Sequence, residues 1–361
     1  MKILNLPKGL TKALLLIISF FCGFIIITNP EIISQSVIFA LNNCFNLVIP
    51  SVFPLLIVTF FISELGFPEV IKKCAQKITL PLFGLSGNCT EAIITGLTGG
   101  YNCSVKASHR LYEAKSITKE EAKRLALFFT CPGLSFSVNI CGMALYSSLR
   151  AGVIFFISSV LSCLITSALY NLFRRNADFN SISLYRKRTA DAFVDSVANS
   201  VSVIITICSW ITVFSIISSI LKITVSADGV NTFISLFGEV TSAVMYSAEN
   251  YSLAVTSLCL NFGGICIFLQ QLPYIIKTGV STLSYLLCRI IQGGISFIIS
   301  SILLRLFPIA TDVFSYPVQF KAYSDSFMGS FALILLGAVL LYSVKSTKDR
   351  AASTKHKTYM H

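Results

Sequence analysis

Residues 90–104 read T-E-A-I-I-T-G-L-T-G-G-Y-N-C-S and form an apolar stretch that is too short to cross a membrane. A helix that spans the hydrocarbon core needs about 20 apolar residues. The stretch begins with a carboxylate, Glu91, and carries Gly96, Gly99 and Gly100 in its second half. Glycine lets the backbone leave the helical conformation and lets other groups approach it closely. Broken backbone at membrane depth is tolerated where protein or a wet cavity borders it, so we expect a re-entrant hairpin. A glycine-rich contact between two helices is the alternative.

The composition is typical of a protein that crosses a membrane several times. Hydrophobic residues make up 54% of the chain and charged residues 12%, whereas a soluble protein carries about 25% charged residues. The net charge of +12 would suit nucleic acid, but the basic residues gather in short clusters between apolar runs, where they set topology. We therefore expect a lipid bilayer as partner and no nucleic acid.

The cysteines and the first apolar run indicate neither a metal site nor a cleaved leader. The 12 cysteines are scattered and form no C-x-x-C pair, and most lie in apolar runs, where cysteine acts as a small hydrophobe. We expect no disulfide framework, no metal and no cofactor. The run 13–28 lacks a small-residue cleavage site and is interpreted as an uncleaved first span.

The basic clusters predict the topology. Lysines precede residues 90–104, and the segment 106–124 that follows is also rich in Lys and Arg. By the positive-inside rule both flanks are cytoplasmic, so residues 90–104 enter and leave the membrane on one side. The same rule places the N-terminus and the basic C-terminal tail in the cytoplasm. We predict an all-α polytopic membrane protein, with about eight transmembrane helices, the last at 329–342, and two re-entrant hairpins.

The second half of the chain resembles the first. The tripeptide L-F-G occurs at 82–84 and at 236–238, and each copy precedes an intramembrane glutamate, Glu91 or Glu239. The topology puts the two hairpins on opposite sides, which gives inverted repeats, an architecture of secondary transporters. The predicted organisation is an N-terminal span (1–35), a first repeat (36–175), a second, inverted repeat (190–306), and a C-terminal span with a basic tail (307–361).

Several local patterns give further predictions. Pro50 and Pro54 in one span predict a kink or a break. Thr118 and Glu121 have the spacing of a capping box. The run F-T-C-P-G-L-S-F-S-V-N predicts a polar break within a span at 125–145, and residues 64–80 predict an amphipathic surface helix. Glu91 and Glu239 should each begin a short helix, because a carboxylate favours the positive helix end.

The candidate solute-binding residues are small or polar and lie at the two hairpin tips or at the breaks. They are Gly99, Gly100, Asn102, Thr130, Ser135, Glu249, Asn250 and Asn261. A carboxylate at bilayer depth marks a functional site by default, although Glu249 could instead be solvated in a shallow hairpin. The neutral residues suit a polar uncharged solute such as a nucleoside or a sugar, with a coupling ion. Hydrogen bonding between helices is their commoner use.

Residues that would indicate an enzyme do not form a recognisable pattern. We find no nucleophile beside a base, no phosphate-binding loop and no metal-ligand spacing. Arg289 lies within a span, where it either snorkels or pairs with a carboxylate. We therefore expect no enzymatic activity, and an intramembrane acyltransferase is the weakest of the alternatives.

Four segments carry a resemblance to a known family: V-I-P-S-V-F-P-L-L-I, P-L-F-G-L-S-G, G-L-T-G-G-Y-N-C-S-V-K-A and E-E-A-K-R-L-A-L-F-F-T-C-P-G. The chain resembles the sporulation integral membrane proteins of endospore-forming bacteria, which belong to the nucleoside-recognition or Gate domain group. Their hairpin typically reads G-x-x-x-G-Y-P-x-G-A-K. Here Gly96, Gly100, Tyr101 and Lys106 match, whereas Asn102 stands in the place of proline. The resemblance covers residues 43–172 best.

The resemblance implies a multi-pass inner-membrane protein that acts in spore formation as a solute channel or transporter. Alternating access, with the two hairpin tips as the solute site, is the leading hypothesis. The rival hypothesis is a structural or assembly protein of the spore envelope that transports nothing. Association into a homo-oligomer is compatible with both.

Overall fold

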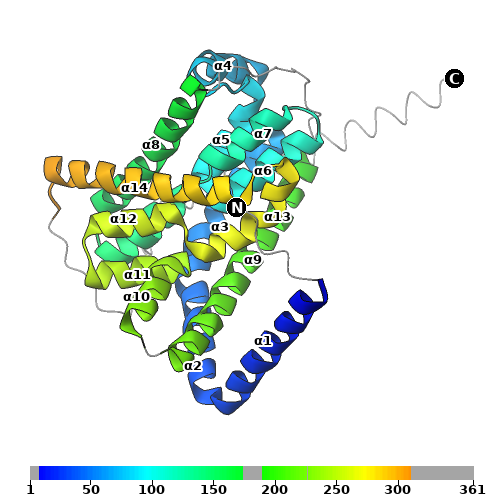
Figure 1. Cartoon of the computed structure of the whole chain (residues 1–361). Helices are drawn as coiled ribbons and strands as arrows, with labels where there is room; N and C mark the ends of the chain where they lie inside the picture. The colour runs from blue at the N-terminus through cyan, green and yellow to red at the C-terminus, as the bar shows by residue number, and fades with distance from the viewer. Residues whose placement is uncertain (1–7, 174–188, 226, 310–361) are drawn as a thin grey trace.

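The computed structural model describes residues 8–173, 189–225 and 227–309, and this part of the chain is helical without any strand (Figure 1). In chain order the α-helices are α1 (Lys8–Thr28), α2 (Pro30–Asn43), α3 (Ile49–Leu65), α4 (Glu69–Phe83), α5 (Thr90–Gly99), α6 (Tyr101–Glu113), α7 (Lys119–Phe128), α8 (Leu149–Phe173), α9 (Thr189–Thr224), α10 (Asp228–Phe237), α11 (Val240–Asn250), α12 (Leu253–Phe262), α13 (Gly264–Thr278) and α14 (Thr282–Leu306). The expected all-α class is confirmed for the described residues.

Five helical runs among the described residues are long and apolar enough to cross a membrane. They are Pro30–Leu65, Leu149–Phe173, Ala190–Thr224, Leu253–Thr278 and Thr282–Leu306. The predicted first span forms the shorter apolar helix Lys12–Thr28, and the predicted span at 329–342 lies outside the described residues. The length and composition of these helices fit a lipid bilayer environment.

The predicted first span, α1, stands apart from the other helices and meets them only at its end (Figure 1). Its contact is a small cluster of Ile25 with Ile33 of α2 and Ile220 of α9. Large apolar side chains such as Phe20 and Ile27 are exposed along the rest of the helix. Lipid chains would cover such a surface, which fits the role of a membrane span.

The first long run stays helical through both prolines. α2 continues into a π-helical segment, Cys44–Val48, and then into α3, which contains Pro50 and Pro54. A π segment holds one extra residue per turn and is a recognised way to change the course of a helix. The predicted distortion is therefore a widened turn before the prolines, and the helix does not break.

The stretch predicted as a re-entrant hairpin, 90–104, forms a helical hairpin. α5 and α6 are separated by Gly100, whose φ of 89° lies in the region that glycine alone adopts readily. The two arms pack closely, because a Cβ on Gly96 would lie 2.7 Å from the Cβ of Ser104. Glu91 lies in the first turn of α5, as predicted. α6 runs on to Glu113, so the second arm is longer than the sequence stretch suggested.

The predicted break inside 125–145 is also present. α7 ends at Phe128, residues 129–133 are not helical, and a π-helical segment, Phe136–Leu145, follows. This break touches the hairpin turn directly, because a Cβ on Gly133 would lie 2.9 Å from the backbone nitrogen of Gly100. Two interruptions of helical backbone therefore meet, and each needs glycine for the approach.

The second half contains its own hairpin and its own break. α11 and α12 are joined by a turn at Tyr251 and Ser252, and Ser247 donates a hydrogen bond to Thr256 between the arms, with 3.0 Å between the oxygens. α12 then ends at Gly263, which has a φ of 83°. The glycine pair at 263–264 interrupts the run Leu253–Thr278.

The capping box predicted before α7 is confirmed. Thr118 accepts a hydrogen bond from the Glu121 amide, and the Glu121 carboxylate accepts one from the Thr118 amide, at 3.2 and 2.8 Å. Glu121 also accepts the amide of Ser86, at 2.8 Å. The box therefore joins the start of α7 to the segment before α5.

The contact between the two breaks can be tested by filling it. We expect Gly133→Ala to lower the free energy of unfolding by about 1–3 kcal/mol, because the added methyl group overlaps backbone atoms that have little room to shift. Gly229→Ala is the matched control, since nothing lies within 4 Å of a Cβ there. Thermal unfolding in detergent measures both. Equal midpoints for the two variants would contradict the close approach.

Candidate functional site

A cavity lies where the first hairpin turn, the break after α7 and the start of α11 meet. We call it the inner cavity. Its walls come mainly from apolar residues of α3 and α9, among them Val52, Leu56 and Ile207. Its polar groups are supplied by the side chains of Thr98, Asn102, Ser135, Glu239, Thr241 and Gln270, and by the backbone at Gly99, Gly100 and Gly133. The volume is about 50 Å³.

Two of the polar groups face each other across helices from the two halves of the chain. The amide of Asn102 in α6 donates a hydrogen bond to the Gln270 Oε1 atom in α13, at 2.8 Å. Asn102 is half-buried and Gln270 is buried. The pair therefore joins the first hairpin to the second half at the edge of the inner cavity.

Glu239 is the only carboxylate among the described residues that line the inner cavity. It is the N-cap of α11, and its side chain accepts hydrogen bonds from the amides of Thr241 and Ser242, both at 2.8 Å. Amide donors and the positive helix end stabilise a buried carboxylate. The structural role expected for Glu239 is thus confirmed, and the same residue also faces the cavity. The Thr241 hydroxyl beside it has no hydrogen-bond partner among the described residues.

The predicted site residues fall into three groups. Gly99, Gly100, Asn102 and Ser135 line the inner cavity. Thr130 and Asn261 are fully buried but do not line it. Glu249 and Asn250 are exposed at the far end of α11, roughly 15 Å along the helix from Glu239 at 1.5 Å per residue. The structure therefore brings the first hairpin tip to the start of α11 and not to the second hairpin tip.

Thr130 and Asn261 belong to a hydrogen-bond network around α14. Asn261 donates to the Ser162 hydroxyl and to the Gln292 carbonyl, at 2.6 and 2.8 Å. The Thr130 hydroxyl donates to the carbonyl of Ala126, at 2.8 Å. These are the bonds between and within helices that polar residues in spans commonly make.

Arg289 of α14 binds the free end of α7. Its guanidinium donates to the carbonyls of Thr130 and, at 3.1 Å, of Leu127, and the neighbouring Gln292 amide donates to the Phe128 carbonyl at 3.0 Å. The last carbonyls of a helix have no partner within it, and a cation is favoured at that end. Arg289 is 2% exposed, so it neither snorkels nor pairs with a carboxylate in the described structure; it caps the break.

Tyr101 supplies a hydrogen-bond donor to the backbone break in the second half, as Arg289 does in the first. Its hydroxyl donates to the Leu260 carbonyl near the end of α12, and its ring lies 3.3 Å from the position of a Cβ on Gly263. Tyr101 is the first residue of α6. The first hairpin thus supports the backbone break of the second half while its next residue, Asn102, faces the inner cavity.

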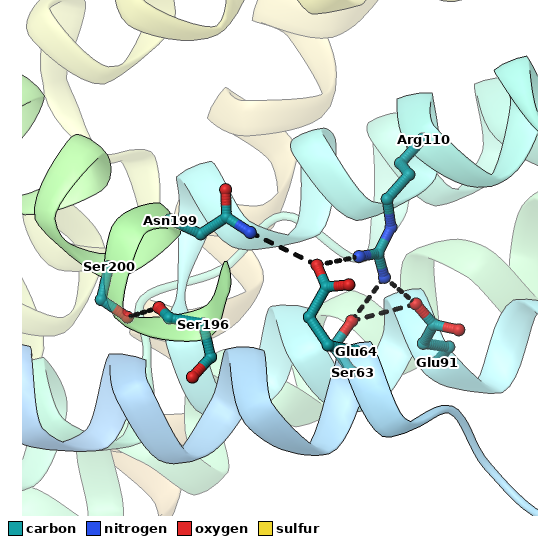
Figure 2. A network of polar contacts seen from close by, with 7 residues as sticks. All are labelled: Ser63, Glu64, Glu91, Arg110, Ser196, Asn199 and Ser200. Atoms are coloured by element: carbon teal, nitrogen blue, oxygen red, sulfur yellow. Dashed lines mark hydrogen bonds and ion pairs between the residues drawn. The ribbon is translucent and has the colours of Figure 1, made fainter. Parts of the chain in front are cut away.

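A second polar cluster lies farther along α6, between the end of α3 and the start of α9 (Figure 2). Arg110 forms ion pairs with Glu64, at 2.7 Å, and with Glu91, and it also donates to the Ser63 hydroxyl at 2.6 Å. The side chains of Glu64 and Glu91 are 5% and 3% exposed, whereas that of Arg110 is 40% exposed. The cluster joins both arms of the first hairpin to α3.

The Arg110 cluster borders a second cavity, which we call the outer cavity. It is lined by Phe60, Ser63, Glu64, Lys106, Ala107, Arg110, Asn199 and Val203, and its volume is about 100 Å³. From the sequence, Lys106 is a topology signal and a match to the hairpin of the similar family, and Arg110 is only a topology signal. Their spacing of four residues from each other, and of Lys106 from Asn102, was the available sign that all three share one face of α6.

Comparison with known proteins gives one distant relative. The chain is 21% identical over 336 residues to the sporulation integral membrane protein YlbJ of Bacillus subtilis (strain 168), and the match covers 80% of this chain and 82% of that protein. No protein-family model matches the chain, and no solved structure matches it. The chain is therefore a distant homologue of a sporulation integral membrane protein, in line with its apolar helices.

The cap formed by Arg289 gives a second prediction. We expect Arg289→Met to lower the free energy of unfolding by about 1–3 kcal/mol, because buried carbonyls of α7 lose their donors. Arg305→Met is the control, since Arg305 is exposed at the end of the same helix. Thermal unfolding of the full chain in detergent compares them. If the Arg289 variant is as stable as the parent, the desolvation cost of the buried guanidinium equals the stabilisation from its hydrogen bonds, and the prediction is wrong.

Proposed function

We propose that the chain is a multi-pass protein of the bacterial inner membrane, with both termini in the cytoplasm, that binds and passes a small polar solute during spore formation. The inner cavity is the solute site, and the protein acts as a transporter and not as an enzyme. The spore context comes from the distant relative, whose name states sporulation and an integral membrane location and nothing about transport.

The observation that carries the proposal is the convergence of interrupted helices on one cavity. The turn at Gly100, the break at Gly133 and the start of α11 at Glu239 all line it. Interrupted backbone is costly in a membrane unless protein or a wet cavity satisfies it. Transporters place such breaks around a solute site near the bilayer midplane. The side chains of Asn102, Gln270 and Thr241 add donors and acceptors at the same place.

The size of the inner cavity limits what it holds in this conformation. A volume of about 50 Å³ has room for a few water molecules, at about 10–15 Å³ for each. A nucleoside or a sugar would require the hairpin to move away from α3 and α9. Alternating access between two inverted repeats would supply that motion, with Gly100 and Gly133 as the contact that opens.

A structural or assembly function in the spore envelope is the second candidate. The apolar walls of the inner cavity and its small volume favour it, because a rigid bundle that passes nothing would also close around its breaks. In that case the Asn102–Gln270 bond would serve only to hold the two halves together. The two candidates differ in whether the inner cavity admits a solute.

Uptake into proteoliposomes tests the transport function. A panel of radiolabelled nucleosides, sugars and amino acids is offered to vesicles that hold the full chain and to empty vesicles. We expect at least one solute to enter faster with the protein, and Asn102→Leu to lower that rate at least tenfold, because the amide is lost and the side chain stays large. Glu249→Gln should leave the rate unchanged, because Glu249 is exposed outside the inner cavity.

Other outcomes would change the proposal. Loss of uptake in Glu249→Gln with normal uptake in Asn102→Leu would move the solute site to the second hairpin tip. If every solute enters empty and loaded vesicles equally fast, the scaffold function is favoured. Thermal unfolding of each variant checks that a lost rate does not reflect a lost fold.

A further inference from the structure

The two cavities follow one another along the same three helices. On α6, Asn102 lines the inner cavity, and Lys106 and Arg110 line the outer one. On α3, Val52 and Leu56 line the inner cavity and Phe60 lines the outer one. These residues are spaced by four, which places each set on one helix face.

The third helix, α9, borders both cavities. Val203 lines both of them, with Ile207 on the inner side and Asn199 on the outer side. Leu56, Phe60 and Val203 are buried at the level between the two. The outer cavity is therefore positioned as the entrance to the inner one, with an apolar constriction between them.

Lys106 lines the outer cavity and has no ion pair among the described residues. The two ion pairs described beside this cavity are both formed by Arg110, with Glu64 and with Glu91. The nearest interaction of the Lys106 ammonium is with the ring of Tyr274, whose centroid is 6.0 Å away, the outer limit of a cation–π contact. A half-buried lysine without a counter-charge is costly near a membrane interior.

Among the described residues that line the outer cavity, the charged ones are Lys106, Arg110 and Glu64, which gives the lining one excess positive charge. Glu91 does not line it, and the Glu64 side chain is 5% exposed and already paired with Arg110. Lys106 is half-buried and Arg110 is 40% exposed. An incoming solute thus meets the cations first. The exposed amide of Asn199 adds a further donor, although it also donates to Glu64 at 3.3 Å.

We propose that the outer cavity is an anion subsite in which Lys106 binds a carboxylate or phosphate group of the entering molecule. The inference deepens the proposed transport function and rests on it for its biological meaning. It makes the solute a small molecule with one anionic group, which lysine holds as a point charge. A volume of about 100 Å³ admits such a group with a few waters.

Charge-selective labelling of a cysteine in the outer cavity tests the subsite without knowledge of the solute. The reporter is Asn199→Cys, in a chain whose described cysteines that are not buried (Cys22, Cys74 and Cys208) are replaced by serine. Two methanethiosulfonate reagents of similar size are used, one with a sulfonate and one with a trimethylammonium group. Their labelling rates in neutral phosphatidylcholine vesicles are each divided by the rate with free 2-mercaptoethanol.

We expect the sulfonate reagent to be favoured at the reporter. Lys106→Gln should reduce the anionic-to-cationic rate ratio at least threefold, and Lys106→Arg should keep it. Lys222→Gln is the matched control, because it removes one exposed positive charge from the same helix as the reporter, about 35 Å away at 1.5 Å per residue. An unchanged ratio in Lys106→Gln, or an equal fall in Lys222→Gln, would overturn the subsite.

Protection of the reporter identifies the source of the anion. Slower labelling with inorganic phosphate in neutral vesicles supports a soluble anion, and slower labelling only when phosphatidylglycerol is added supports a lipid headgroup at the same lysine. The result is separable from the transport function. A Lys106-dependent rate ratio without uptake of any solute would support the subsite and refute transport. Uptake of a solute with an unchanged rate ratio would support transport and refute the subsite.

Discussion

The capping of the α7 carbonyls by Arg289 is the interaction on which the rest of the site depends. A helix that stops inside an apolar bundle leaves carbonyls that no water reaches, and each unpaired group there is costly. Arg289 and Gln292 supply the missing donors from α14. With those carbonyls satisfied, residues 129–133 hold a non-helical path, and that path brings Gly133 against Gly100. The position of the first hairpin turn, and so of Asn102 at the inner cavity, follows from it. Tyr101 satisfies a carbonyl at the end of α12 in the same way, by donating a hydrogen bond to Leu260. The donor at each of these two breaks therefore comes from the other half of the chain.

What the sequence could predict was local. The glycines of the first hairpin, the capping box of Thr118 and Glu121, and the break at Pro132 and Gly133 all depend on residues close together in the chain, and their chemistry is visible in the pattern. The role of Arg289 was not visible, because its acceptor at Thr130 is 159 residues away and a backbone carbonyl leaves no mark in the sequence. The same applies to Asn261, whose partner Ser162 is 99 residues distant. A polar residue in a span indicates that it has a hydrogen-bond partner, but the sequence does not identify that partner.

The candidate site illustrates the same division. Gly100 and Asn102 were found because glycine and a polar residue adjoin at a turn, and both face the inner cavity. Glu239 was recognised as a helix start, but its presence at that cavity depends on how the second half packs against the first. Glu249 carries the same chemistry and is exposed. A carboxylate at a hairpin tip and a carboxylate at a hairpin base look alike in sequence, and only the contact of α11 with the first hairpin separates them.

One face of α6 carries polar residues that line both the inner and the outer cavity. Asn102 pairs with Gln270, Arg110 pairs with two carboxylates, and Lys106 between them pairs with none among the described residues. Arg110 closes a cluster that ties α6 to α3 and α5, so its charge is already compensated. Lys106 keeps its charge available at the outer cavity, where the carboxylate of Glu64 is already paired with Arg110. A helix that needed only to pack there would gain from an apolar residue at position 106, since an uncompensated cation lowers stability. The charge of Lys106 therefore fits the proposed anion subsite better than a role in helix packing alone.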